Sequence, residues 1–226
     1  MKKTQLCLAI LAAIVLATAA PAMAQVRLGP VVDINFANVS TDDPEFKDLA
    51  STYMRFGIGG VIEYPLNENL SFVAEPMILG KGSKGEMSEG GATAEGKVKL
   101  SYFEVPLLVK YTFGEKGRKK DDAIQPYVLA GPTIGFKTGA KATTSLSGTD
   151  MDADLSGTED ISDEVSGTDL GLALGGGVAK GFGSAKGFVE AQYVFGLKNI
   201  EKDSDTSTKN KGFQIRVGVT FPLGSK

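Results

Sequence analysis

Residues 212–223 read GFQIRVGVTFPL, and apolar side chains alternate there with polar or small ones. A period of two is typical of a β-strand, because successive side chains point to opposite faces. Such a strand has one apolar face and one polar face. The same alternation recurs along the chain and predicts eight strands, at residues 27–37, 52–64, 70–80, 97–113, 124–136, 168–180, 186–197 and 212–223.

The connections between these segments alternate between short and long. The short ones are 65–69, 114–123 and 181–185, and the long ones are 38–51, 81–96, 137–167 and 198–211. Only residues 44–50, PEFKDLA, suggest a turn of helix. This regularity predicts an all-β, up-and-down antiparallel barrel with its turns at one end and its long loops at the other. Closing the sheet into a barrel also removes its unpaired edges.

The polar faces of the predicted strands carry both charges and glycines. Six acids and three bases fall there, namely Asp33, Arg55, Glu63, Glu75, Glu104, Lys110, Asp169, Glu190 and Arg216. Glycines 57, 59, 171, 175 and 218 share that face. Water gives no reason to place glycine between charges, whereas the interior of a small barrel needs small residues beside large ones. We therefore predict an interior ion-pair network, in which Arg216 pairs with acids such as Glu190 or Glu104.

The apolar faces carry aromatic residues in two bands. One band lies toward the turns (Tyr64, Phe72, Tyr111, Phe113 and Phe221) and one toward the loops (Phe36, Phe56, Phe103, Phe136 and Phe213). Aromatic girdles flank the lipid-facing belt of membrane barrels. The apolar stretches are also of about ten residues, enough for a tilted strand to cross a bilayer. The full prediction is an eight-stranded up-and-down antiparallel transmembrane β-barrel. A soluble periplasmic barrel with its apolar face around a lipid-like ligand stays as an alternative.

Residues 1–24 have the features of a secretory signal peptide. Lys2 and Lys3 precede an apolar stretch, and Ala22-Met23-Ala24 resembles a cleavage site. Residues 25–226 would then form one barrel domain in the outer membrane of a Gram-negative bacterium. The formal charge of the chain is −3, and it becomes −5 without Lys2 and Lys3. This charge argues against nucleic acid as a partner.

Residue types for nucleophilic or acid–base catalysis are scarce. The chain has no histidine, and its one cysteine, Cys7, lies within the predicted signal peptide. Glu75 and Glu104 could act as an acid–base pair, but both are predicted to face a packed interior, where ion pairing is the better explanation. We therefore expect no enzymatic activity and no cofactor. Gly175-Gly176-Gly177 lies within a strand and is interpreted as a close-packing point rather than a phosphate-binding loop.

The longest loop offers a weak candidate for a metal site. Asp150, Asp152 and Asp154 have the D-x-D-x-D spacing that begins a calcium-binding loop. The rest of that pattern fails, because Leu155 stands where glycine is required and Ile161 where glutamate is required. A solvated acidic loop is the better interpretation. The turn at 114–122, GEKGRKKDD, is likewise interpreted as a solvated basic turn.

Four blocks carry a resemblance to a known family. They are LSYFEVPLLVKYTF (100–113), QPYVLAGPTIGF (125–136), TDLGLALGGGVAKGF (168–182) and VEAQYVFGLKNI (189–200). In order and spacing they resemble the PorT-like outer-membrane β-barrels of Bacteroidetes. The founding member of that family is tied to secretion of surface proteases, and most members have no assigned activity. Many such barrels end on an aromatic residue, whereas this chain continues past Phe221 with PLGSK.

The function expected from these features is structural or interactive. The barrel would have an interior filled by side chains and long surface loops for adhesion, scaffolding or a role in secretion. Its expected partners are outer-membrane lipid, lipopolysaccharide, the barrel assembly machinery and a protein bound through the loops. A narrow channel for ions or small solutes is the alternative within the membrane.

Overall fold

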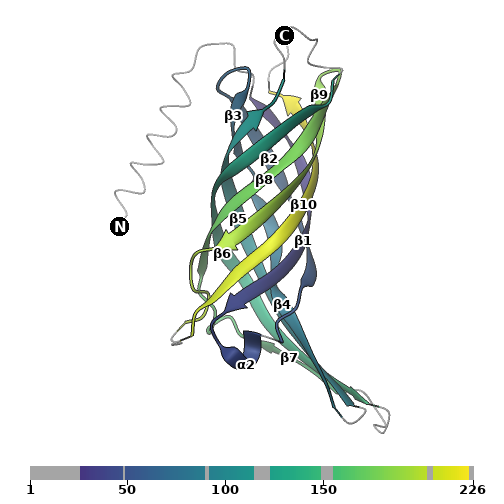
Figure 1. Ribbon diagram of the computed structural model, residues 1–226, viewed down its shortest axis with the longest axis vertical. Coiled ribbons are helices and arrows are strands. Elements are labelled where there is room, and N and C mark those ends of the chain that lie inside the picture. The colour runs from purple at the N-terminus through teal and green to yellow at the C-terminus, as the bar shows by residue number, and fades with distance from the viewer. Residues whose placement is uncertain are drawn as a thin grey trace, which may run out of the picture.

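The computed structural model describes residues 26–47, 49–89, 92–114, 123–148, 155–202 and 206–223. In these residues the chain forms ten strands and one helical turn (Figure 1). They are β1 (Arg27–Thr41), α2 (Pro44–Lys47), β2 (Tyr53–Pro65), β3 (Leu70–Ala74), β4 (Met77–Glu89), β5 (Ala92–Thr112), β6 (Gln125–Gly148), β7 (Leu155–Asp160), β8 (Thr168–Phe182), β9 (Ala185–Gly196) and β10 (Thr208–Pro222).

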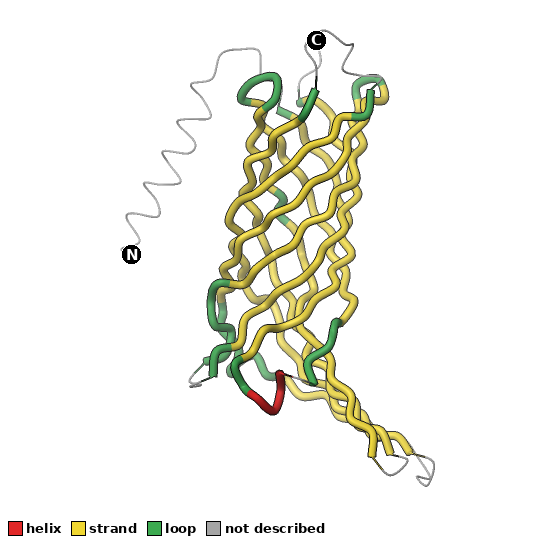
Figure 2. The backbone as a smooth tube through the Cα atoms, in the orientation of Figure 1, coloured by secondary structure: helices red, strands yellow, loops and turns green. Residues whose placement is uncertain are grey.

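The strands form a closed antiparallel barrel. β1 pairs with β2 on one side and with β10 on the other, so the first and last strands meet in the wall. β10 continues through β9, β8 and β6 to β5, each antiparallel to the next. β5 returns to β2 through both β3 and β4. The strands run obliquely around the barrel, as both views show (Figures 1 and 2).

The predicted fold class is confirmed, but the predicted count of eight strands is not, because the structure has ten. One extra strand arises where the predicted strand 70–80 is divided at Glu75 and Pro76. Pro76 lacks an N–H group and so does Pro106 on the adjacent β5, which interrupts the ladder there. The register nevertheless continues across the gap, from Ala74 opposite Leu107 to Met77 opposite Glu104. The other extra strand, β7, lies in a stretch predicted to be loop.

The apolar side chains of the wall face outward. Phe56 and Ile58 are each 65% exposed, whereas Arg216 on the inner face has no exposed surface. On the outside, the rings of Phe36 and Phe213 lie 6.3 Å apart toward the loop end, and those of Tyr111 and Phe113 lie 5.2 Å apart at the turn end. This orientation is the one a lipid environment requires, and it is the reverse of the soluble alternative.

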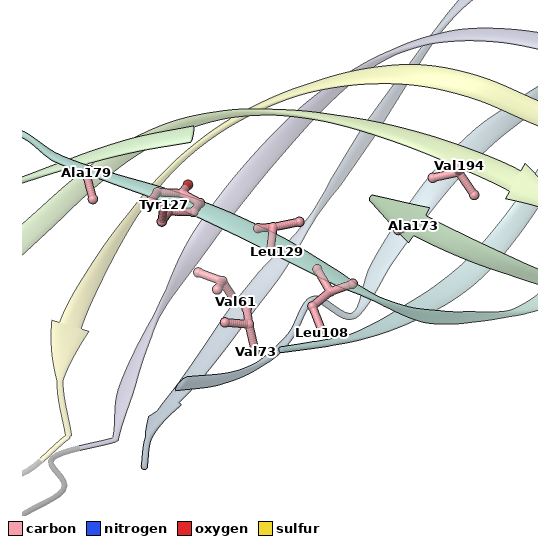
Figure 3. Packing of buried hydrophobic residues seen from close by; sticks show 8 residues of the cluster. All are labelled: Val61, Val73, Leu108, Tyr127, Leu129, Ala173, Ala179 and Val194. Carbon is pink, nitrogen blue, oxygen red and sulfur yellow. The ribbon is translucent and has the colours of Figure 1, made fainter. Parts of the chain in front are cut away.

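Apolar clusters fill parts of the interior. The one nearest the short turns is drawn in Figure 3, where side chains from different strands converge; it comprises Val61, Val73, Leu108, Tyr127, Leu129, Ala173, Ala179 and Val194. A second cluster of Val31, Met77 and Leu79 receives Phe188, which also packs against the first. A third lies toward the loop end and is formed by Leu100, Tyr102, Ala140, Val165 and Ile200. The charged groups of the interior lie among these clusters.

Part of the long-loop end is sheet rather than loop. β4 continues to Glu89, β5 begins at Ala92 and β6 continues to Gly148, so most of the predicted loop 81–96 is paired sheet. With β7 they make a four-stranded extension beyond the barrel, at the bottom of Figures 1 and 2. We call residues 84–89, 92–99, 141–148 and 155–160 the arm. The helical turn expected within 44–50 is present as α2. In the described part of the chain, no helix is long and apolar enough to cross a membrane.

Candidate functional site

The centre of the barrel interior is organised around Arg216 on β10. Its Nε donates to Asp33 Oδ2 of β1 at 2.9 Å, and its NH1 pairs with Glu75, which lies between β3 and β4. None of the three side chains is more than 1% exposed. Asp33 faces Arg216 directly in the ladder, so the register of the two terminal strands creates the first pair. Each charge is thus removed from water and paired, which is the condition for tolerating it there.

The same row of the ladder continues to Glu190 on β9, Gly177 on β8 and Tyr127 on β6. The Tyr127 hydroxyl donates to Glu190 Oε2 at 2.7 Å. A Cβ atom on Gly177 would lie 2.7 Å from Tyr127 Cζ and 2.7 Å from Glu190 Cβ. Glycine therefore leaves the space in which the tyrosine crosses its neighbouring strand. The close-packing role expected of the triple glycine applies at this position.

Gln192 joins the two acidic groups of this centre. Its Nε2 donates to Glu190 Oε1 at 2.7 Å and to Glu75 Oε2 at 3.2 Å. A continuous network therefore runs from Asp33 through Arg216, Glu75 and Gln192 to Glu190 and Tyr127. It crosses the interior and connects strands that are not neighbours in the wall.

Two further charge clusters lie on either side of this centre. Toward the loop end, Lys81 Nζ pairs with Glu104 and lies 3.0 Å from Asp169 Oδ2, which also accepts from Asn210 at 2.9 Å. Toward the turn end, Lys110 Nζ lies 2.7 Å from Glu63 Oε1, and it also lies 4.9 Å from the centroid of the Tyr127 ring. Fixed acid–base pairs thus occupy the interior at several levels.

The comparison with protein families decides the class of this barrel. Residues 20–202 match the model of a family described as outer membrane protein beta-barrel domain. The chain belongs to this family. Membership places the barrel in the outer membrane of a Gram-negative bacterium, with its exposed apolar belt in lipid. The match concerns outer-membrane barrels in general and does not single out the PorT-like subgroup.

Solved structures of outer-membrane barrels are similar to this chain at low identity. Neisserial surface protein A is 13% identical, with 88% of this chain and 97% of that chain covered and a TM-score of 0.49. Ail from Yersinia pestis is 12% identical, with 88% and 99% covered and a TM-score of 0.39. The N-terminal barrel domain of OprF from Pseudomonas aeruginosa is 16% identical, with 85% and 97% covered and a TM-score of 0.32. No curated protein matches the chain.

Some of the predicted ion pairs in this outer-membrane barrel need correction. Arg216 pairs with Asp33 and Glu75 rather than with Glu190 or Glu104. Arg55 joins none of the ion pairs in the described part of the chain. Its guanidinium lies over Gly80, where a Cβ atom would come within 2.7 Å of Nε, and 5.2 Å from the Tyr53 ring centroid.

Other polar residues of the network were missed. Lys81 was assigned to a loop, although the alternation of Met77, Leu79 and Lys81 continues beyond residue 80. Gln192 stands two residues after Glu190 and therefore on the same face, which was a usable signal. Asp150, Asp152 and Asp154 lie outside the described residues, as do residues 115–122 of the basic turn. Within the described ranges, no group of three or more acidic, histidine or cysteine side chains is placed to hold a metal ion.

Outside the barrel, the arm ends in a strand with an open edge. Its strands are ordered β4, β5, β6 and β7. Among the described residues β7 pairs with β6 alone, and every β7 residue is exposed. One side of β7 therefore presents backbone N–H and C=O groups to the medium. Leu155 is 61% exposed beside them. An open strand edge of this kind can accept another extended segment.

Proposed function

We propose that this outer-membrane barrel is closed to solutes and acts at the cell surface as a protein-interaction module, with the arm as its contact element. The observation that carries this proposal is the arm itself, a four-stranded sheet that extends beyond the barrel and ends in an open-edged strand. Adhesion, scaffolding and a secretion-associated role would all use such a contact. The partner would be a protein offering an extended segment that pairs with β7.

The interior supports the closed state. Arg216, Gln192 and Glu104 are fully buried side chains from three different strands. If the lumen were filled with water, as in the wider porins, these side chains would be exposed to solvent. We therefore expect no steady single-channel steps when the purified barrel is inserted into planar bilayers. Reproducible conductance steps would instead favour the narrow channel.

The proposal also includes the partners of the barrel in the membrane and its relationship to the PorT-like group. The exposed aromatic and aliphatic belt would contact outer-membrane lipid and lipopolysaccharide, and insertion would require the barrel assembly machinery. The four sequence blocks given above support a PorT-like relationship within the wider family. We infer no catalysis, because the candidate acids Glu75 and Glu104 are buried and each is paired with a base.

The pairing of residues across the β4–β5 and β6–β7 ladders indicates where the arm can be shortened. Deleting residues 86–95 leaves Gly85 and Gly96 as a two-residue turn between the paired Lys84 and Lys97. Deleting residues 145–156 and introducing Thr144→Asn leaves Asn-Gly between the paired Thr143 and Thr158. Both are sequences that two-residue hairpins favour. The shortened barrel should keep the same heat-modifiability on gels, because neither deletion touches the interior network.

The test uses a photo-crosslinking residue at Glu159 on β7, with Ser40 at the end of β1 as the matched exposed control. On intact host cells, Glu159 should give a discrete adduct that Ser40 does not. Purified full-length barrel in nanodiscs should compete with this adduct, whereas the shortened barrel should not. Equal labelling at the two positions, or competition by the shortened form, would overturn the assignment of the contact to the arm.

A further inference from the structure

The loop end of the barrel contains a cavity that the arm-mediated contact does not explain. Its volume is about 620 Å³, and it opens beside the base of the arm. This volume lies within the range of small-molecule sites, roughly 300–1,000 Å³. The wall is formed by β1, β4 and β5 together with Asp43, Leu49 and Ala50 and the segments around residues 161–165 and 200–208. The cavity is distinct from the charged network, which lies deeper in the barrel.

The inner surface of this cavity is apolar. Its main contributors are Val39, Leu49, Val98, Leu100, Ile161 and Ile200. Leu100 and Ile200 belong to the apolar cluster at the loop end, and Val39, Val98 and Ile161 pack against that cluster while staying partly exposed. An apolar body bound there would remove these side chains from water, which favours binding.

The charged groups that line the cavity are mainly acidic. They are Asp43, Glu86, Glu164 and Glu201, with Lys84 as the single base among the lining residues. Glu86, Glu164 and Glu201 are exposed, so their carboxylates lie toward water rather than in the apolar part. This arrangement attracts a cation and repels an anion. An anionic amphiphile such as a fatty acid or a phosphorylated lipid is therefore disfavoured.

Backbone hydrogen bonds hold the cavity walls in place. Ser51 N donates to Lys84 O at 2.7 Å, which ties the segment before β2 to β4. Ser166 N donates to Ile200 O at 2.7 Å, and Lys202 N donates to Glu164 O at 2.9 Å. These bonds connect the two loop segments that carry Glu164 and Glu201. A cavity fixed in this way loses little freedom when a ligand enters.

We propose that this cavity binds a small cationic amphiphile, with its apolar body against Val98, Leu100 and Ile200 and its amine or guanidinium group among the acids at the opening. The shape supplies the apolar contact, and the carboxylates supply the selectivity for positive charge. The site is accessible from the cell surface and does not require passage through the barrel.

Three water-soluble probes that share the same phenylbutyl group separate the contribution of apolar contact from that of charge. They are 4-phenylbutylamine, 4-phenylbutanol and 4-phenylbutyrate, titrated calorimetrically into the full-length barrel in nanodiscs, with empty nanodiscs as the control for partitioning. We expect the amine to bind about 10-fold more tightly than the alcohol at low salt, and the carboxylate more weakly than the alcohol. The proposal would be overturned if the carboxylate bound as tightly as the amine or more tightly. It would also be overturned if no probe bound to the barrel more than it does to empty nanodiscs.

Variants then locate the binding. A Cβ atom on Gly96, which lines the cavity, meets nothing within 4 Å, so Gly96→Trp should place its indole in the cavity. Gly139→Trp is the control, because Gly139 has equal room and does not line the cavity. Gly96→Trp should abolish amine binding and Gly139→Trp should leave it unchanged, both at parental heat-modifiability. Unchanged binding in Gly96→Trp would place the probe elsewhere and refute the site.

A charge variant tests the selectivity without altering the shape. Exchanging the three exposed acids for amides (Glu86→Gln, Glu164→Gln and Glu201→Gln) should bring the amine and the alcohol to within about 3-fold of each other. Binding of the alcohol itself should not change. If the preference for the amine survives the triple variant, these carboxylates do not select the ligand. Glu86 and Gly96 lie on β4 and β5 of the arm, and none of these variants alters β7, which carries the proposed protein contact, so failure of one proposal can be distinguished from failure of the other.

Discussion

The barrel interior and the arm use the same charged residue types under opposite conditions. Inside, Arg216 and its two acidic partners are at most 1% exposed, and the ladder holds Arg216 directly opposite Asp33. On the arm, Lys97 and Glu95 also form an ion pair, at 2.6 Å, but their side chains are about 30% exposed. Water can solvate a broken pair on the arm and cannot reach one in the interior. The difference teaches that burial, rather than the number of ion pairs, determines what each pair contributes.

The largest difference between the interior and the arm should appear when the guanidinium of Arg216 is removed. Arg216→Leu leaves the carboxylates of Asp33 and Glu75 buried without their base, and we expect a loss of about 3–5 kcal/mol in the free energy of unfolding. Urea unfolding of the folded barrel in detergent, followed by the heat-modifiability shift, measures it. Arg55→Leu is the matched control, since Arg55 makes no ion pair in the described residues, and its effect should be clearly smaller. Equal losses in the two variants would mean that Arg216 contributes only packing.

The close packing around Gly177 should give the next largest effect in the interior. Gly177→Val places a branched side chain where even a Cβ would lie 2.7 Å from Tyr127 and from Glu190. We expect a loss of about 1–3 kcal/mol from overpacking in the same unfolding assay. Gly139→Val is the control, because a Cβ there meets nothing within 4 Å. A stable Gly177→Val barrel would show that β8 can shift to accommodate the side chain.

A single hydrogen bond of the network gives a smaller effect. Tyr127→Phe removes the donor to Glu190 Oε2 and leaves the ring in place. The expected loss is about 1.5 kcal/mol or somewhat more, the range for a hydrogen bond to a charged group. Tyr111→Phe, on the outward face, should change stability very little. A loss in Tyr111→Phe as large as that in Tyr127→Phe would contradict the special role of the buried hydroxyl.

The same contrast explains what the sequence could predict. Barrel strands such as 212–223 separate an apolar outer face from a polar inner face, so the alternation identified them and oriented Arg216 inward. The β6 and β7 parts of the arm are largely exposed to water on both faces. Residues 141–148 and 155–160 therefore show no such alternation, although hydroxyl pairs such as Thr143 with Thr158 do connect the strands. The sheet there was predicted as loop for that reason.

Pairing partners were harder to predict than orientation. The face of Glu190 and of Arg216 followed from the period of two. The choice of Asp33 and Glu75 as partners depends on the register between terminal strands and on the reach of side chains across the lumen, and alternation contains neither. Pro76 and Pro106 were visible in the sequence. Their effect on the strand count, however, appears only once β4 and β5 are known to be adjacent.

The smallest effect should come from the ion pair on the arm, and it completes the comparison. Lys97→Ala removes the partner of Glu95 at a place where solvent already reaches both side chains. Exposed pairs of this kind usually contribute little, because water and salt screen the attraction. We expect no measurable shift in the urea midpoint, and no change when Glu95→Gln is added to the same chain. If Lys97→Ala instead destabilises the barrel as strongly as Arg216→Leu, the arm would be coupled to the fold of the wall, and its role as an independent contact element would have to be abandoned.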